Sequence, residues 1–247
     1  MRRNKSNSIL IGPLYCEDIS VTDLVNELSI SRRFPKSFFY LNAHCLNLAL
    51  DDLSFRNTMN CSDITFCDGY GIKMLSYLFC KRCLKNRNTP TDFVDLVYQQ
   101  IYNFGSKVYF LGGTERSIQG YSAKIDIYFP GIIAGYHHGF YDENKLHQVI
   151  EKINDSKPLL LLVGMGMPKQ EQFVYQNIQN LNVSNILTVG DLFSWRYDSW
   201  RGPRFLTDHG FEWFFRLCRN PMQLWRRYLF DLPALPLKLF FRTIRRL

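Results

Sequence analysis

The stretch Leu159–Glu171, LLLLVGMGMPKQE, constrains the fold more than any other part of the chain. An apolar run of this length between Pro158 and Gly164 predicts a strand buried on both faces of a parallel sheet. Pro168 suits the first turn of the helix that follows, where its missing N–H is not needed. We therefore predict a strand, a tight glycine turn and a helix N-terminus that directs backbone N–H groups and partial positive charge at an anion. A diphosphate fits such a site.

Similar apolar runs recur along the chain and alternate with segments of helical periodicity. The runs are SILIGPL, SFFYL, ITFC, KVYFL, IIAGY, LLLLV and NILTVG. The helical segments include Val21–Ile30, Ile72–Phe79, Phe93–Phe104, Ile118–Phe129, Leu146–Ile153 and Gln172–Ile178. This alternation predicts an α/β, Rossmann-like fold with a largely parallel sheet and flanking helices. SILIGPL is interpreted as a first strand rather than a signal peptide, because its apolar core is short and acidic residues follow it.

The residues just after each apolar run are the candidate site residues, because ligands of open α/β sheets bind beyond the carboxyl ends of the strands. They are Asn42, Asp68, Gly69, Gly112, Gly113, Gly164, Gly166, Lys169, Gln170, Glu171 and Asp191. Small and polar groups thus converge on one edge, as a nucleotide-sized ligand requires. The glycine turn matches neither G-x-G-x-x-G nor a P-loop motif, so neither a dinucleotide fold nor a P-loop ATPase is predicted. An ordinary strand-to-helix turn is the alternative, and the donors of Lys169 and Gln170 favour the anion site.

Asp68 lies between a strand and a Gly-Tyr-Gly turn, which leaves two interpretations. It is a turn or cap residue, or it is a general base, since a partly desolvated carboxylate can take a proton from a hydroxyl nucleophile. Asn42 leaves the same choice between a helix cap and a ligand contact. Thr91 and Asp92 are predicted near a helix start, where capping is the first interpretation.

The cysteines and histidines do not predict a metal site. The seven cysteines are odd in number and scattered, which indicates reduced thiols in a cytosolic compartment. Cys80 and Cys83 form a C-x-x-C pair without a second pair, so packed thiols are the preferred interpretation. His137 and His138 follow a strand and are candidates to contact a sugar or phosphate, with no third ligand at metal spacing.

Charge divides the chain into two parts. The net charge is +8, and residues 201–247 hold ten Lys and Arg against three Asp and Glu. In FEWFFRLCRNPMQLWRRYLF, apolar residues recur at helical spacing, which predicts a basic amphipathic helical appendage. Such helices lie in membrane interfaces, held by apolar burial and by anionic lipid; packing on the core is the alternative. We predict an α/β domain over 1–200 and the appendage over 201–247, with no transmembrane helix and no nucleic-acid binding.

Seven motifs in order resemble the WecG/TagA/CpsF glycosyltransferases, glycosyltransferase family 26. They are YLNAHCLNLA, CDGYGI, TPTD, YFLGG, GYHHGFY, VGMGMPKQE and RGPRFLTDHGFEWFFRL…PMQLWRRYL, and they cover about residues 38–229. The family is described as metal-independent and inverting. It is described as moving N-acetylmannosamine or its uronic acid from a UDP donor to a polyprenyl-diphosphate-linked sugar at the cytoplasmic face of the bacterial membrane. The resemblance implies a cofactor-independent enzyme of cell-surface polysaccharide synthesis, peripheral on the anionic inner membrane.

The resemblance also implies roles for particular residues. Asp68 matches the catalytic base, and Asn42 and Gln170 match donor-pocket positions. The tail arginines match an appendage that reaches the membrane and the lipid diphosphate; they are Arg201, Arg204, Arg216, Arg219, Arg226 and Arg227.

Four positions depart from the family pattern, namely Tyr40, Pro90, Asp191 and Ser194. They leave the donor sugar open between an N-acetylmannosamine-type sugar, a uronic acid and a hexose. A nonenzymatic nucleotide-sugar-binding subunit of a polysaccharide assembly complex is the alternative function. Self-association into a homo-oligomer also stays open.

Overall fold

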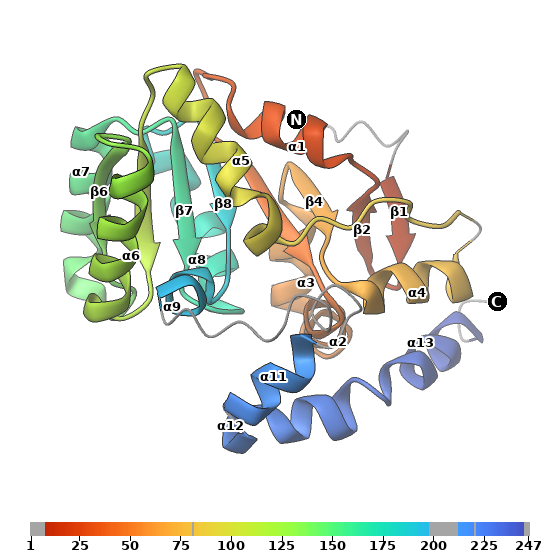
Figure 1. Cartoon of the computed structure of the whole chain (residues 1–247). Helices are drawn as coiled ribbons and strands as arrows, with labels where there is room; N and C mark the ends of the chain where they lie inside the picture. The colour runs from red at the N-terminus through yellow and green to blue at the C-terminus, as the bar shows by residue number, and fades with distance from the viewer. Residues whose placement is uncertain (1–7, 81, 198–211, 220, 245–247) are drawn as a thin grey trace.

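The computed structural model describes residues 8–80, 82–197, 212–219 and 221–244 (Figure 1). Its centre is an eight-stranded sheet in the order β1-β2-β4-β3-β8-β7-β5-β6. The strands are β1 Ser8–Ile11, β2 Leu14–Glu17, β3 Lys36–Leu41, β4 Ile64–Cys67, β5 Val108–Gly112, β6 Ile133–His137, β7 Leu160–Gly164 and β8 Asn185–Thr188. Neighbouring strands are parallel except for β1 and β2. The predicted α/β fold with a largely parallel sheet is confirmed.

Helices cover both faces of this sheet (Figure 1). The α-helices are α1 Val21–Leu28, α2 Ala43–Asp51, α3 Leu53–Asn60, α4 Tyr70–Phe79, α5 Pro90–Asn103, α6 Glu115–Tyr128, α7 Leu146–Ser156, α8 Lys169–Asn177, α9 Leu192–Tyr197, α11 Glu212–Arg219, α12 Pro221–Arg226 and α13 Leu235–Ile244. Short 3₁₀ turns η2 Glu143–Lys145 and η3 Ile178–Asn180 and the π-turn η4 Arg227–Asp231 complete them. Helices α1, α5, α6 and α9 contact one another along one layer, and α2, α3 and α8 do so along the other.

The N-terminal segment differs from the prediction. SILIGPL does not form one strand, because Gly12 turns the chain with a φ of 58°. Strands β1 and β2 therefore pair as an antiparallel hairpin in which Ile11 faces Leu14. A two-residue loop with positive φ matches the twist of such a hairpin, and glycine adopts that φ without strain.

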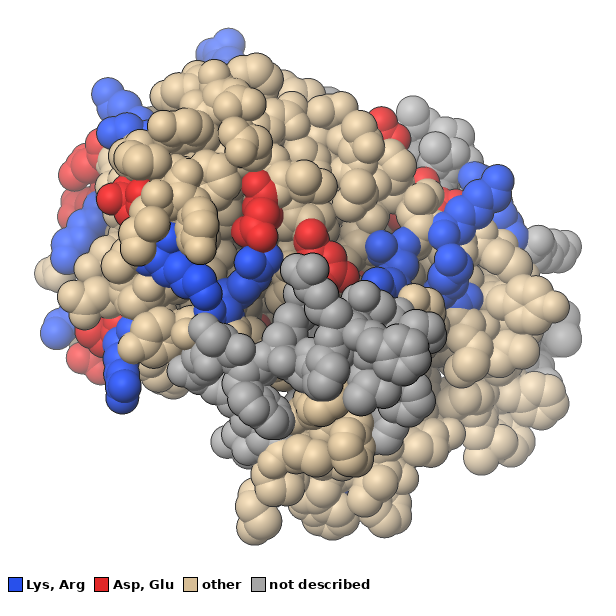
Figure 2. Space-filling model, in the orientation of Figure 1, with Lys and Arg blue, Asp and Glu red and all other residues tan. Residues whose placement is uncertain are grey.

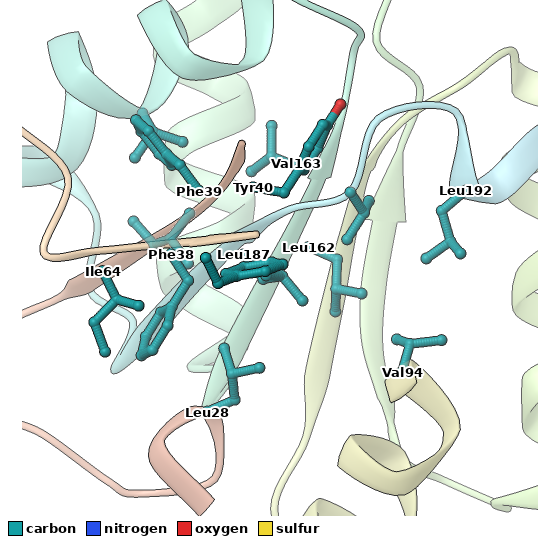
Figure 3. Close-up of a cluster of buried hydrophobic side chains, with 14 of the residues drawn as sticks. Leu28, Phe38, Phe39, Tyr40, Ile64, Val94, Leu162, Val163, Leu187 and Leu192 are labelled. Carbon is teal, nitrogen blue, oxygen red and sulfur yellow. The ribbon is translucent and has the colours of Figure 1, made fainter. Parts of the chain in front are cut away.

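The core lies between the sheet and its two helical layers. Strands β3, β5, β7 and β8 are buried along almost their whole length, as strands covered on both faces must be, whereas the edge strand β6 is only partly buried. Figure 3 shows Phe38, Leu162 and Leu187 packed together in this core. Tyr40 belongs to the same cluster, but its hydroxyl points away from it.

The last helix of the tail packs back onto the body of the protein. Leu235 and Leu239 of α13 are buried, and a Cβ on Gly12 would lie only 2.8 Å from Cδ2 of Leu239. Lys238 Nζ donates to Asp51 Oδ2 at 2.8 Å and to Asn47 Oδ1 at 2.9 Å. In the described ranges, no helix combines the length and the apolar character needed to cross a membrane.

Candidate active site

A cavity opens at the carboxyl ends of the strands, where β3 and β8 lie side by side. This junction separates the two halves of the sheet, β1 to β4 and β5 to β8, and such a switch point is where open α/β sheets bind ligands. Among the residues predicted from strand ends and motifs, Asn42, Asp68, Thr91, Gly166 and Asp191 line the cavity. Residues far apart in the sequence are therefore brought to one site.

The Asp68 carboxylate faces the cavity and is held by a neighbouring hydroxyl. Thr89 Oγ1 donates to Asp68 Oδ1 at 2.9 Å, and Arg87 Nη1 donates to Thr89 Oγ1 at 3.2 Å. Thr89 is the N-cap of α5, yet its side chain makes no capping hydrogen bond, so its hydroxyl serves the carboxylate instead. The N-cap residue of α4 is Gly69 rather than Asp68.

Several helices begin at the rim of this cavity. Asn42 caps α2 by accepting from Cys45 N at 3.0 Å, and it lines the cavity as well. The cap interpretation is therefore confirmed, and the ligand contact stays a prediction. Thr91 lies in the first turn of α5, and Gly166 precedes α8. The N-termini of three helices thus direct partial positive charge toward one space, which favours an anionic ligand.

A buried hydrogen-bonded network supports the loop after β8. Gln170 Oε1 accepts from Gly190 N at 3.0 Å, while Gln170 Nε2 donates to Tyr40 Oη at 3.2 Å and to Glu171 Oε1 at 2.6 Å. Gln170 and Glu171 are both 0% exposed. The direct substrate contacts predicted for these two side chains do not fit this structure, since both side chains are fully buried. Gln170 fixes Tyr40 and Gly190, which line the cavity.

Burial shifts the ionisation of this network. Burial raises the pKa of Glu171 to about 7 and raises the pKa of the Tyr40 phenol well above its usual value. Within the part of the chain that the structure describes, Glu171 Oε2 has no hydrogen-bond partner. Because Gln170 directs an N–H at Tyr40, the phenol oxygen is an acceptor in this pair.

The glycines at the strand ends allow the backbones to approach one another. A Cβ on Gly112 would lie 2.1 Å from Gly164 O, and a Cβ on Gly190 would lie 2.7 Å from Tyr40 Oη. Gly113 N donates to Gly164 O at 3.0 Å. The structure therefore gives Gly112, Gly113 and Gly164 a packing role, and the substrate contact predicted for these glycines stays a prediction.

Three further predicted site residues lie outside the cavity lining. Lys169 Nζ donates to Gly139 O at 2.8 Å. The same Nζ lies over the face of the Tyr141 ring, 5.5 Å from the ring centroid. Asp92 pairs with Arg87 at 3.6 Å. Gly69 has a φ of 84° and turns the chain into α4. Lys169 is therefore held toward the loop after β6. Asp92 lies in the first turn of α5, which confirms its predicted position near a helix start, and it also forms the ion pair with Arg87.

The tail arginines are only partly described. Arg201 and Arg204 lie outside the described residues. Arg216 and Arg219 belong to α11, Arg226 to α12 and Arg227 to η4, and the Arg226 side chain is exposed. Tail residues Phe214, Met222, Trp225, Leu229 and Phe230 expose apolar side chains.

A second cavity lies beside β6, apart from the first. His137 and His138 line it together with Lys145 and Lys152. The His137 ring nitrogen Nδ1 lies 2.8 Å from His138 O. No group of three or more potential metal-binding side chains occurs among the described residues.

Sequence reasoning did not identify Thr89, Arg87, His44 or Trp195 as parts of the site. Thr89 and Arg87 support Asp68, and His44 and Trp195 line the cavity. The NRNTPT segment carried a signal for Thr89, since a threonine before a proline at a helix start is an expected N-cap. The hydrogen bond from the Thr89 hydroxyl to Asp68 joins residues 21 positions apart in the sequence, and no local sequence pattern indicates such a contact.

Comparison with known proteins gives consistent matches over most of the chain. A family model described as "Glycosyl transferase WecG/TagA/CpsF family" matches residues 11–247. The chain is 27% identical over 220 residues to the N-acetylglucosaminyldiphosphoundecaprenol N-acetyl-beta-D-mannosaminyltransferase of Bacillus subtilis, covering 85% of this chain and 81% of that protein. Proteins of the same name from Bacillus spizizenii and Staphylococcus aureus are 29% and 24% identical, covering 73% and 75% of this chain and 70% and 71% of the relatives.

Proposed function

Because the chain belongs to the WecG/TagA/CpsF family of glycosyltransferases, we propose that it transfers a sugar from a UDP donor to a polyprenyl-diphosphate-linked sugar. Its relatives are named as enzymes that add N-acetylmannosamine to N-acetylglucosaminyldiphosphoundecaprenol, which supports an N-acetylmannosamine-type donor over a hexose. The nonenzymatic alternative is not retained, because the chain is a member of an enzyme family.

The observation that carries this proposal is the Asp68 carboxylate, held by Thr89 at a cavity where helix N-termini converge. In the proposed reaction, Asp68 takes the proton of an acceptor hydroxyl as the hydroxyl oxygen forms a bond to the anomeric carbon. The bond between that carbon and the diphosphate breaks, and UDP leaves with the electron pair. Attack opposite the leaving group inverts the anomeric configuration.

The diphosphate is proposed to lie against Gly166 and the start of α8. The dipoles of α2, α5 and α8 offset the charge that develops on the leaving group, because preorganised dipoles stabilise such charge without reorganisation. Asn42, Thr91 and Asp191 complete the proposed donor site. Gln170 acts from beneath by holding Tyr40 and Gly190, and Glu171 accepts a hydrogen bond from Gln170.

The proposed acceptor is linked to a lipid, so the enzyme is proposed to work peripherally at the cytoplasmic face of the membrane. The exposed apolar side chains of the tail and its excess of arginine support contact with an anionic bilayer. The tail arginines are proposed to face the acceptor diphosphate or anionic headgroups. The predicted division of the chain near residue 200 is retained as part of this proposal.

A product assay tests the function. Purified protein is incubated with a polyprenyl-diphosphate-linked N-acetylglucosamine and one UDP-sugar at a time, and released UDP and glycolipid product are measured together. We expect release that depends on the acceptor and is fastest with UDP-N-acetylmannosamine. The proposal is wrong if no UDP-sugar in a panel of N-acetylhexosamines, uronic acids and hexoses yields a glycolipid.

A further inference from the structure

Helix α4 is apolar on two sides, and only one of them is covered. Ile72 and Leu75 face the core and are buried. On the outer side, Met74, Tyr77 and Leu78 are 55%, 74% and 57% exposed. A surface helix normally carries polar residues opposite its buried stripe, and a contiguous exposed apolar patch marks an interaction site.

The exposed face of α4 continues onto α13. These two helices contact each other and lie side by side on the same side of the molecule (Figure 1). While Leu235 and Leu239 anchor α13 to the body, Leu237, Phe240 and Phe241 remain more than half exposed. The two outer faces thus form one apolar surface, here termed the α4–α13 surface and defined by Met74, Tyr77, Leu78, Leu237, Phe240 and Phe241.

Positive charges predominate in the chain segment that contains α4. Between Asp68 and Asp92 the sequence contains five Lys and Arg and no Asp or Glu. Lys73 lies on α4 itself, with its Nζ 2.8 Å from Lys85 O. Figure 2 shows Lys and Arg side chains gathered over the loop that follows α4, above the tan surface of α4 and α13. Apolar side chains flanked by cations match the interface of an anionic bilayer.

The position of α4 links this surface to the cavity. The helix starts at Tyr70, two residues after Asp68, so a bilayer that contacts α4 lies close to the carboxylate. A lipid-linked diphosphate resides at that depth, because its charged group stays at the headgroups while its chain is in the hydrocarbon.

We propose that the α4–α13 surface inserts into the interface of an anionic lipid bilayer and presents the Asp68 cavity to it. The membrane contact then includes a helix of the α/β body and is not confined to the arginine-rich tail. This inference rests on the proposed function only for the identity of the acceptor, because binding to a bilayer is measured without any transfer.

The test uses the full-length protein and vesicles made of equal parts phosphatidylglycerol and phosphatidylcholine. The α4 variant combines Met74→Gln, Tyr77→Gln and Leu78→Gln, since glutamine is a good helix former. The matched control combines Ile127→Gln and Tyr128→Gln on α6, where the side chains are 77% and 68% exposed on another helix. We expect the α4 variant to lower the vesicle partition coefficient roughly tenfold or more, because three apolar side chains no longer leave water. The control is expected to bind as the wild type does.

Two further measurements keep the outcome clear. Circular dichroism and UDP binding test whether the α4 variant is folded. If it is not folded, the single variant Tyr77→Gln is used instead, and we expect it to lose less vesicle binding than the triple variant. UDP release with a short-chain, water-soluble acceptor should be unchanged by the α4 variant. The inference is overturned if the α4 variant binds vesicles like the wild type, or if α4 and α6 variants lose binding equally. It is also overturned if light scattering shows that the α4 variant only converts a dimer to a monomer.

Discussion

At the scale of single residues, Gln170 supports the floor of the cavity although its own side chain is fully buried. Its amide oxygen holds the Gly190 N–H, and its amide nitrogen holds Tyr40 and Glu171. Because these three bonds use both ends of the amide, the orientation of the side chain is fixed. A change at Gln170 therefore affects two cavity residues. Tyr40 loses the hydrogen bond to its hydroxyl, and Asp191 loses the hydrogen bond that holds the backbone of the preceding Gly190.

Replacing Gln170 by leucine is expected to lower the free energy of unfolding by roughly 1–3 kcal/mol, the cost of leaving a buried polar partner unsatisfied. UDP affinity should fall as well, because the Gly190–Asp191 loop loses its support. Urea unfolding and calorimetric titration with UDP measure the two effects. The control Gln176→Leu changes an exposed residue of the same helix and should alter neither. Equal UDP affinity of Gln170→Leu and wild type would contradict the supporting role.

Glu171 gives the stability a specific dependence on pH. Its pKa is about 7 in the folded protein, raised by burial from 4.5, so folding favours its protonated form. Stability from this group is complete below pH 4.5 and is lost as the pH rises to 7, because the unfolded chain releases the proton first. Over that window the wild type should lose roughly 3 kcal/mol of unfolding free energy relative to Glu171→Gln. Parallel pH profiles of the two proteins would show that the carboxyl titrates normally.

At the scale of elements, the carboxyl ends of β5 and β7 are in close contact at Gly112 and Gly164, beside the cavity. A methyl group on Gly112 would overlap Gly164 O at 2.1 Å, so β5 and β7 would have to separate. Gly112→Ala should cost roughly 1–3 kcal/mol of stability through overpacking, in addition to the strain of its φ of 140°. Gly131→Ala is the control, because Gly131 has a φ of 76° but open space around it. Thermal unfolding should show a clearly larger loss for Gly112→Ala, and equal losses would exclude the packing explanation.

The helices and strands were predicted from the sequence more accurately than the side-chain contacts between them. Buried parallel strands read as continuous apolar runs, so LLLLV and NILTVG located β7 and β8. Amphipathic periodicity located α1 and α7 close to their observed bounds. The hairpin at Gly12 was missed because a single glycine and proline interrupt the apolar run SILIGPL. Whether Gln170 faces a ligand or the interior depends on side chains brought together from β3 and β8, and local periodicity does not contain that information.

At the scale of the whole molecule, the tail serves both packing and charge. Leu235 and Leu239 are buried, with Leu239 next to Gly12 of the hairpin, and residues 201–247 hold most of the basic excess. Deleting residues 209–247 should abolish sedimentation with anionic vesicles, since each cation near such a surface contributes about 1 kcal/mol. The deletion should also lower the thermal stability, because it exposes the surface under α13. If the protein without residues 209–247 still sediments normally with the vesicles, the tail has only a structural role. For the intact protein, raising the salt concentration should weaken vesicle binding, because salt screens the attraction between charges.

The central claim is that Asp68 is the general base of a cavity that binds a UDP-sugar. Asp68→Asn keeps the size and the acceptor oxygen for Thr89 but cannot take a proton at neutral pH. We expect nearly unchanged UDP affinity by calorimetry and a turnover of glycolipid lowered by roughly 10²- to 10⁴-fold, the usual contribution of general-base catalysis. Wild-type turnover in Asp68→Asn would contradict the role of Asp68 as general base, because the proton would then leave by another group.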